Sequence, residues 1–253
     1  MGVAALLCTL FAPLAGSLAL LLINRDQTKA IRVTALAISI LTLGASLLLL
    51  PEFDQSLSSF QFVIDQQWIP AFDAGFRIGI DGTSLLLVLL TTFIMPIALL
   101  SSWSSIHKQE KEYYVLLLLL QFGMTGVFLA LDTFLFYVFW ELILIPMYFV
   151  IGIWGGKDRI YAAIKFFLYT LVGSLLMLIA IIWLGYSTAD HVFTADLMKL
   201  QAAGPMIPFE VQKWLFLAFA LAFCIKVPLF PLHTWHSLRQ GVGRDQCSLR
   251  SPS

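Results

Sequence analysis

The feature that most constrains this chain is a series of apolar runs, each about twenty residues long, separated by short segments in which the charged residues gather. As helices rising about 1.5 Å per residue, such runs can cross the ~30 Å hydrocarbon core of a bilayer. Only 12% of the residues are charged, about half the share typical of a soluble domain. The sequence therefore predicts an all-α polytopic protein embedded in a lipid bilayer. Its 15 basic residues balance its 15 acidic residues, so nothing indicates binding to nucleic acid.

About seven membrane-spanning helices are expected, at residues 2–23, 31–50, 83–103, 113–131, 133–155, 160–186 and 213–235. Residues 1–235 would form one transmembrane domain, in which Asp132 marks a short turn between the fourth and fifth spans. The N-terminal run lacks the basic start of a signal peptide, so we expect it to remain as the first helix. The tail at 236–253 is polar and aperiodic and is expected to be disordered.

The connections between spans carry further signals. One set holds ten Lys and Arg residues and the opposite set only three, which predicts an outside N-terminus by the positive-inside rule. Apolar residues alternate at 60–64 and again at 76–80, around a turn containing Pro, Asp and Gly, which predicts a small β-hairpin. Residues 194–200 suit either a short surface helix or a plain loop. Asp81 is placed to cap the third span or to lie in its first turn.

Glu141 is the first candidate functional residue. It follows Asp132 by nine residues, which places it ~14 Å deep along a helix and too deep to reach water. A charge at that depth costs at least ~2.5 kcal/mol, so intramembrane acids mark functional sites by default. Tyr137 and Tyr148 share its expected helix face. We interpret Glu141 as a proton-carrying carboxylate; the alternative is a structural acid bonded to a neighbouring helix.

Lys226 is the second candidate. It lies ~20 Å along the last span, counted from Lys213. Pro228 and Pro231 follow and are expected to break the helix just after the lysine, as at the ion sites of transporters. Burial favours the neutral amine and a nearby carboxylate favours the ammonium, so this group can switch its charge. The alternative is a lysine that extends its amine to the membrane surface.

Two further residues could relay protons. Lys165 lies ~9 Å past Arg159, between Tyr161 and Tyr169 on one helix face. At this depth the Lys165 side chain can extend its amine to the membrane surface more easily than Lys226 can. A lysine that only extends to the surface therefore remains the alternative. His233 lies near the inner end of the last span, where a relay role and a hydrogen-bonded structural role are both open.

Motifs for cofactor binding are absent from the sequence. There is no P-loop, dinucleotide glycine fingerprint, metal motif, or haem or iron–sulfur cysteine spacing. The three cysteines form no disulfide framework. We therefore expect no cofactor on this chain, and the energy for ion movement must come from elsewhere.

Four segments resemble a known family. They are FLFYVFWELILIPMYFVIGIWGG, AAIKFFLYT, FCIKVPLFPLHTW and, at 78–91, IGIDGTSLLLVLLT. They resemble the antiporter-like proton-pumping membrane subunits of respiratory complex I, or NADH-quinone oxidoreductase, and among these subunit M, or chain 4. The resemblance covers residues 1–235. It implies the first half of an inverted-repeat transporter-like fold, with Glu141 as the family's buried glutamate and Lys226 as its broken-helix lysine. Lys165 matches a lysine of the following helix.

The resemblance also implies where the chain works. NADH, FMN, iron–sulfur clusters and quinone would be bound by other subunits, while this subunit moves protons beside its membrane partners. A bacterial inner membrane is the expected location, and a thylakoid membrane remains open. The family pattern stops after Trp235, which predicts a truncated product. Two alternatives follow: a subunit of a multi-subunit sodium/proton antiporter, and a non-functional truncated fragment.

Overall fold

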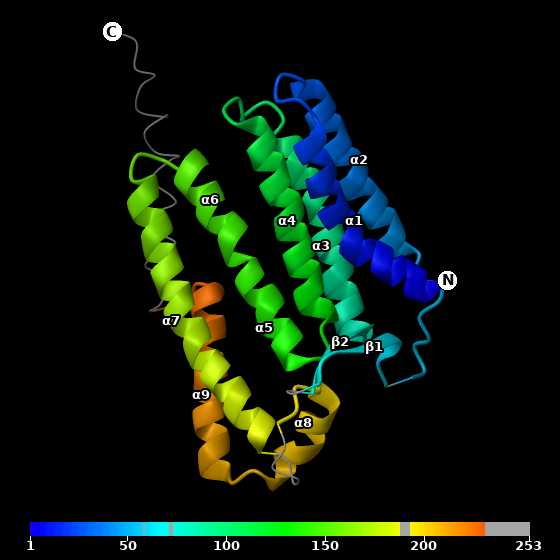
Figure 1. Cartoon of the computed structure of the whole chain (residues 1–253), viewed down its shortest axis with the longest axis vertical. Helices are drawn as coiled ribbons and strands as arrows, with labels where there is room; N and C mark the ends of the chain where they lie inside the picture. The colour runs from blue at the N-terminus through cyan, green and yellow to red at the C-terminus, as the bar shows by residue number, and fades with distance from the viewer. Residues whose placement is uncertain (58, 71–72, 188–192, 231–253) are drawn as a thin grey trace. The chain divides into compact units, whose positions relative to one another are not determined.

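The structure, a computed structural model, describes residues 1–57, 59–70, 73–187 and 193–230. The chain forms two compact units (Figure 1). The first comprises Met1–Pro146 with Ala195–Leu197, and the second comprises Met147–Thr194 and the chain from Met198 onward. Among the described residues, six helical segments are long and apolar enough to cross a membrane. The predicted class of polytopic helical membrane protein is therefore confirmed.

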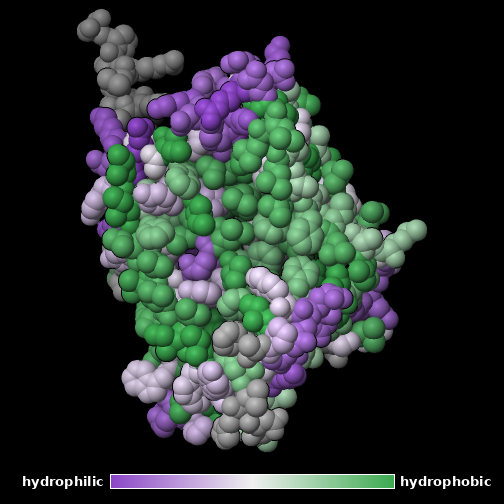
Figure 2. Space-filling model, in the orientation of Figure 1, coloured by the Kyte–Doolittle hydropathy of each residue, from purple (hydrophilic) through white to green (hydrophobic). Residues whose placement is uncertain are grey.

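The first unit is built around four long helices: α1 (Gly2–Leu22), α2 (Thr28–Leu47), α3 (Gly82–Ser101) and α4 (Glu110–Leu129). The helix α4 packs against the other three and against the shorter α5 (Thr133–Leu142). Two hydrophobic clusters fill this bundle, one around Leu10, Val88 and Leu129 and the other around Leu20, Leu99 and Leu118. Hydrophilic residues gather at the end of the unit where α1 joins α2 and α3 joins α4 (Figure 2).

A two-stranded hairpin joins α2 to α3. Strand β1 (Gln61–Ile69) pairs antiparallel with β2 (Ala74–Ile80), as the alternating residues predicted. The chain then enters α3 through a capping box: the Asp81 carboxylate accepts from the Ser84 amide at 2.7 Å, and the Ser84 hydroxyl accepts from the Asp81 amide at 2.8 Å. Strand β2 also holds the turn before α5, because the Leu131 amide donates to the Arg77 carbonyl at 2.8 Å.

The second unit contains most of α6 (Leu144–Trp154) and of α8 (Leu197–Ala203). It also contains α7 (Arg159–Tyr186), the 3-10 turn η2 (Gly204–Met206) and α9 (Phe209–Lys226). The helix α8 confirms the short-helix alternative for residues 197–200, whereas residues 194–196 are not helical. The helix α9 packs on α7, where Gly173 leaves room for Ala222 and Ile225. It corresponds to the seventh expected span, but it carries Glu210, Lys213 and Lys226 and is not among the six apolar spans.

Two glycines let α4 approach α5 closely. A Cβ at Gly126 would overlap the ring of Phe139, and a Cβ at Gly123 would lie 2.9 Å from the Ile143 side chain. We therefore expect Gly126→Ala to lower the free energy of unfolding by about 1–3 kcal/mol, the usual effect of overpacking.

Gly44→Ala is the matched control for this prediction. Gly44 lies inside α2 with nothing within 4 Å of a Cβ, so alanine there should stabilise by up to about 1 kcal/mol through helix propensity. Thermal unfolding of both variants in detergent measures the difference. Equal effects at the two positions would show that α4 and α5 do not pack this closely.

Candidate functional site

Glu141 lies next to a break in its membrane helix. The helix α5 ends at Leu142 and α6 begins at Leu144, with Ile143 as a turn residue between them. Pro146 explains the break, because it has no N–H to donate to the Leu142 carbonyl and its ring crowds that carbonyl. The expected continuous helix over 133–155 is therefore interrupted near its middle. Glu141 occupies the last turn before the interruption.

The Glu141 carboxyl group is incompletely hydrogen-bonded. Its side chain is half-buried, and its Oε1 atom is buried without a hydrogen-bond partner among the residues that the structure describes. Phe139 and Ile143 contact α4, so Glu141, which lies between them in sequence, points to the opposite side of α5. Tyr137 shares that side, one turn earlier. Tyr148 lies beyond the break, in the second unit, where its ring contacts Phe167 of α7 at 5.7 Å between centroids.

Lys226 is the last residue of α9, and the predicted break at Pro228 is confirmed. Pro228 cannot donate to the Cys224 carbonyl, and the Leu229 amide donates to it instead at 2.9 Å. The lysine side chain is half-buried. A cation in the last turn of a helix is favoured by the partial negative charge of the helix end. Glu141 and Lys226 therefore both lie just before a helix break that a proline explains.

Lys165 lies one and a half turns into α7. Its ammonium group is 5.8 Å from the centroid of the Tyr169 ring, within the range of a cation–π contact. Tyr161 and Tyr169 lie one turn to either side of Lys165 on the same helix face. Glu141 belongs to the first unit, and Lys165 and Lys226 belong to the second. His233, Pro231 and the tail at 236–253 lie outside the described residues.

Comparison with known proteins places these residues in a family. Residues 130–237, which include Glu141, Lys165, Lys226 and His233, match the family described as NADH:quinone oxidoreductase/Mrp antiporter, transmembrane. This segment belongs to that antiporter-like family. The predicted resemblance is confirmed.

Relatives of this chain agree with the match. The chain is 43% identical over 237 residues to NADH-quinone oxidoreductase subunit M of Rhodobacter capsulatus, covering 89% of this chain and 46% of the relative. It is also 43% identical over 229 residues to NADH-ubiquinone oxidoreductase chain 4 of Arabidopsis thaliana, covering 89% and 45%. The chain thus spans about half the length of the relatives it matches.

A solved structure shows the same fold. The chain superimposes on a chain of respiratory complex I from Thermus thermophilus with bound NADH, with a TM-score of 0.77 and 30% identity. The match covers 93% of this chain and 46% of the other. It supports the predicted relation to the antiporter-like membrane subunits of complex I.

The chain also contains an ion cluster that the sequence did not predict. Arg77 on β2 contacts three carboxylates: Asp73 at 2.9 Å, Asp65 at 3.0 Å and Asp132 at 3.2 Å. Burial lowers the pKa of Arg77, but Asp73 and Asp65 outweigh it, so the pKa lies above its usual value. Arg77 therefore stays charged and ties the hairpin to the start of α5.

Asp132 is the buried member of this cluster and the cap of α5. Its Oδ1 atom accepts from the amides of Phe134 and Leu135, both at 3.0 Å, and its Oδ2 atom accepts from the Gly75 amide at 2.9 Å. Burial raises the pKa of Asp132 above its ordinary value, although these amides and Arg77 oppose the rise. Asp132 thereby fixes where α5 begins, nine residues before Glu141.

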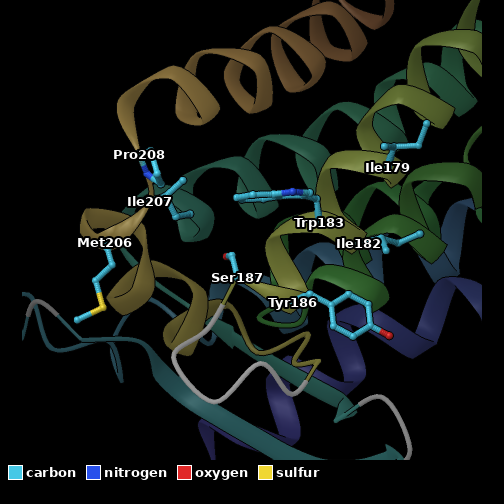
Figure 3. A pocket seen from close by; sticks show the side chains of 8 residues that line it. All are labelled: Ile179, Ile182, Trp183, Tyr186, Ser187, Met206, Ile207 and Pro208. Atoms are coloured by element: carbon cyan, nitrogen blue, oxygen red, sulfur yellow. The ribbon is translucent and has the colours of Figure 1, made fainter.

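An apolar hollow of about 620 Å³ lies in the second unit, between the end of α7 and the segment before α9 (Figure 3). Trp183 and Tyr186 line it, as is typical of aromatic residues near a membrane surface. The Ser187 hydroxyl at its edge donates to the Leu184 carbonyl at 2.7 Å. Among the described residues that line it, there is no carboxylate, amine or imidazole for proton transfer. Elsewhere in the described ranges, no three His, Cys, Asp or Glu side chains are grouped to hold a metal ion.

Proposed function

We propose that this chain is part of a proton-translocating membrane subunit of an NADH:quinone oxidoreductase. Electron transfer from NADH to quinone would take place in other subunits and drive protons through the buried Glu and Lys residues of this one. Its partners would be the other membrane subunits, and a bacterial inner membrane would be its location. The observation that carries the proposal is the buried Glu141 oxygen, which has no hydrogen-bond partner among the described residues and lies beside a helix break inside a membrane span.

In the proposed mechanism Glu141 takes up and releases the transferred proton. A carboxyl oxygen without a partner is free to bind a water molecule or a second titratable group that delivers a proton. Lys226 would supply the opposing charge, staying protonated while a carboxylate is near and releasing its proton when that carboxylate is neutralised. Lys165 and His233 would relay protons to or from the membrane surface.

Helix breaks suit such a role because they leave backbone carbonyls without helical donors. Inside a membrane these groups are tolerated where protein or water satisfies them, and water is what a proton path needs. Pro146 and Pro228 place one such break beside each of the two central residues. The proposal therefore links each titratable side chain to a local route for water.

Lys226→Met tests the lysine's role. A chimera joins residues 1–235 of this chain to the remainder of the Rhodobacter capsulatus subunit M and is assembled with the other subunits of that complex. The complex with the unmutated chimera is the reference. In membrane vesicles we expect Lys226→Met to reduce the rate of NADH-driven proton pumping to less than about a tenth of the reference rate, because methionine cannot hold a proton. Lys213→Met, at an exposed lysine paired with Glu210, should pump like the reference. Normal pumping by Lys226→Met would remove the lysine from the mechanism.

A sodium/proton antiporter subunit is the second candidate, because the matched family includes Mrp antiporters. The same vesicles distinguish the two functions. A pH gradient that forms on adding sodium without NADH would favour the antiporter. A gradient that needs NADH and is independent of sodium would favour the redox-driven pump.

A further inference from the structure

A layer of buried polar side chains crosses the first unit between its two hydrophobic clusters. Along α2 and the turn after it, the layer lies between Ala35 of one cluster and Leu49 of the other. On α3 it lies between Met95 and Val88. On α4 its two residues lie on either side of Phe122 in sequence. Its members are fully buried in the interior of membrane helices. They are Ser39, Thr42 and Ser46 on α2, Thr92 on α3, and Gln121 and Thr125 on α4.

Most of the hydroxyl groups in this layer are satisfied by protein atoms. The Ser39 hydroxyl donates to the Leu36 carbonyl at 2.9 Å, and the Thr42 hydroxyl donates to the Ile38 carbonyl at 2.8 Å. Ser46 and Thr92 are joined across α2 and α3 by a hydroxyl–hydroxyl bond of 2.8 Å. These groups need no further partner.

Gln121 and Thr125 differ from them. Both polar atoms of the Gln121 amide, and the Thr125 hydroxyl, are buried without a hydrogen-bond partner in the described part of the chain. The two residues lie one turn apart on the side of α4 away from Gly123 and Gly126, which face α5. They therefore point into the bundle of α1, α2 and α3. Each unsatisfied group would cost about 1–3 kcal/mol.

Two prolines add backbone acceptors to the same bundle. Pro13 inside α1 cannot donate to the Thr9 carbonyl, and Pro96 inside α3 cannot donate to the Thr92 carbonyl. Thr9 and Thr92 are both fully buried. In hydrocarbon, such carbonyls require a donor from protein or water.

We propose that a small cluster of ordered water molecules binds in this layer, held by the Gln121 amide and the Thr125 hydroxyl and shared with the carbonyls of Thr9 and Thr92. Water both donates and accepts, so it satisfies amide, hydroxyl and carbonyl groups together, and a buried water needs two to four such partners. The layer contains no carboxylate, which argues against a metal cation as its ligand. The inference concerns the α1–α4 bundle and is independent of the function proposed for Glu141.

Water-edited solid-state NMR on the unmutated chain in lipid bilayers tests this proposal. We expect magnetisation to pass from water to the Gln121 side-chain amide at a rate comparable to that of Gln27, which is exposed. The Leu118 methyl groups, one turn earlier in a dry hydrophobic cluster, should respond roughly tenfold more slowly. A Gln121 response as slow as that of Leu118 would overturn the proposal.

Two further measurements identify the ligand and its partners. Gln121→Leu removes one partner and should slow the transfer to Thr125, whereas unchanged transfer to Thr125 would show that Gln121 does not hold the water. Replacing sodium by a large organic cation should leave the Gln121 signals in place. A shift on removing sodium would show that the layer binds a cation and not water alone.

Discussion

Replacing Glu141 by glutamine in the subunit M chimera should reduce the rate of NADH-driven proton pumping to less than about a tenth of the unmutated rate. Glutamine keeps the size and polarity of the side chain but cannot carry a proton. The basis for this expectation is the buried Oε1 atom beside the α5–α6 break, which no group in the described part of the chain bonds. The rate of acidification of membrane vesicles after NADH addition measures it. The amount of assembled complex on native gels separates lost pumping from lost assembly.

Glu210→Gln is the matched control for this substitution. The Glu210 side chain is 77% exposed at the start of α9 and pairs with Lys213 at 2.8 Å. Pumping should be unchanged in this variant because an exposed ion pair contributes at most about 1 kcal/mol. If Glu141→Gln and Glu210→Gln pump equally well, Glu141 is a structural acid.

The second large effect is expected at Asp132, in the stability of the fold. Asp132→Ala leaves Arg77 without its buried partner and removes the cap of α5, so we expect the free energy of unfolding to fall by about 3–5 kcal/mol. The fully buried side chain and its bonds to Gly75, Phe134 and Leu135 account for this size. Thermal unfolding in detergent provides the measurement.

Asp65→Ala removes another carboxylate from the same guanidinium group. The Asp65 side chain is 60% exposed, so its loss should lower the stability by less than about 1 kcal/mol. A similar loss in the two variants would mean that the Asp132 contact is no more buried than the Asp65 contact.

Asp132 should also give the stability a recognisable pH dependence. Because burial raises its pKa in the folded state, the folded chain binds more protons than the unfolded chain at pH values just above the ordinary carboxyl pKa of about 3.9. The contribution of Asp132 to the free energy of unfolding is therefore fully present below that pH. It is lost as the pH rises through the pKa of Asp132 in the folded state. Asp132→Asn should remove this slope. A slope that persists in Asp132→Asn would assign it to another group.

Helix positions and one of the two helix breaks could be predicted from the sequence because they depend on local residue patterns. Long apolar runs predicted the membrane class, alternation predicted the hairpin, and Pro228 predicted the end of α9 at Lys226. The break at Ile143 was missed although Pro146 signals it, because the apolar pattern of 133–155 continues through it. The predicted face joining Glu141 to Tyr148 does not exist as one continuous helix for the same reason.

Contacts between distant residues could not be predicted in this way. Arg77 and Asp132 are 55 residues apart, and only the folded hairpin brings them together. Their individual positions at loop ends gave no signal beyond solvated charges. Likewise, the burial of Gln121 and Thr125 depends on how α4 is rotated within its bundle, which a uniformly apolar helix does not reveal. The sequence therefore located titratable residues within membrane helices better than it located their surroundings.

Infrared difference spectroscopy during turnover tests most directly whether Glu141 changes its protonation state. The spectrum compares the oxidised chimeric complex with the complex after NADH addition. We predict a change in the carbonyl stretch of a protonated carboxyl group that is present in the reference, retained in Glu210→Gln and lost in Glu141→Gln. An identical carboxyl signal in the reference and in Glu141→Gln would contradict a proton-carrying role for this residue.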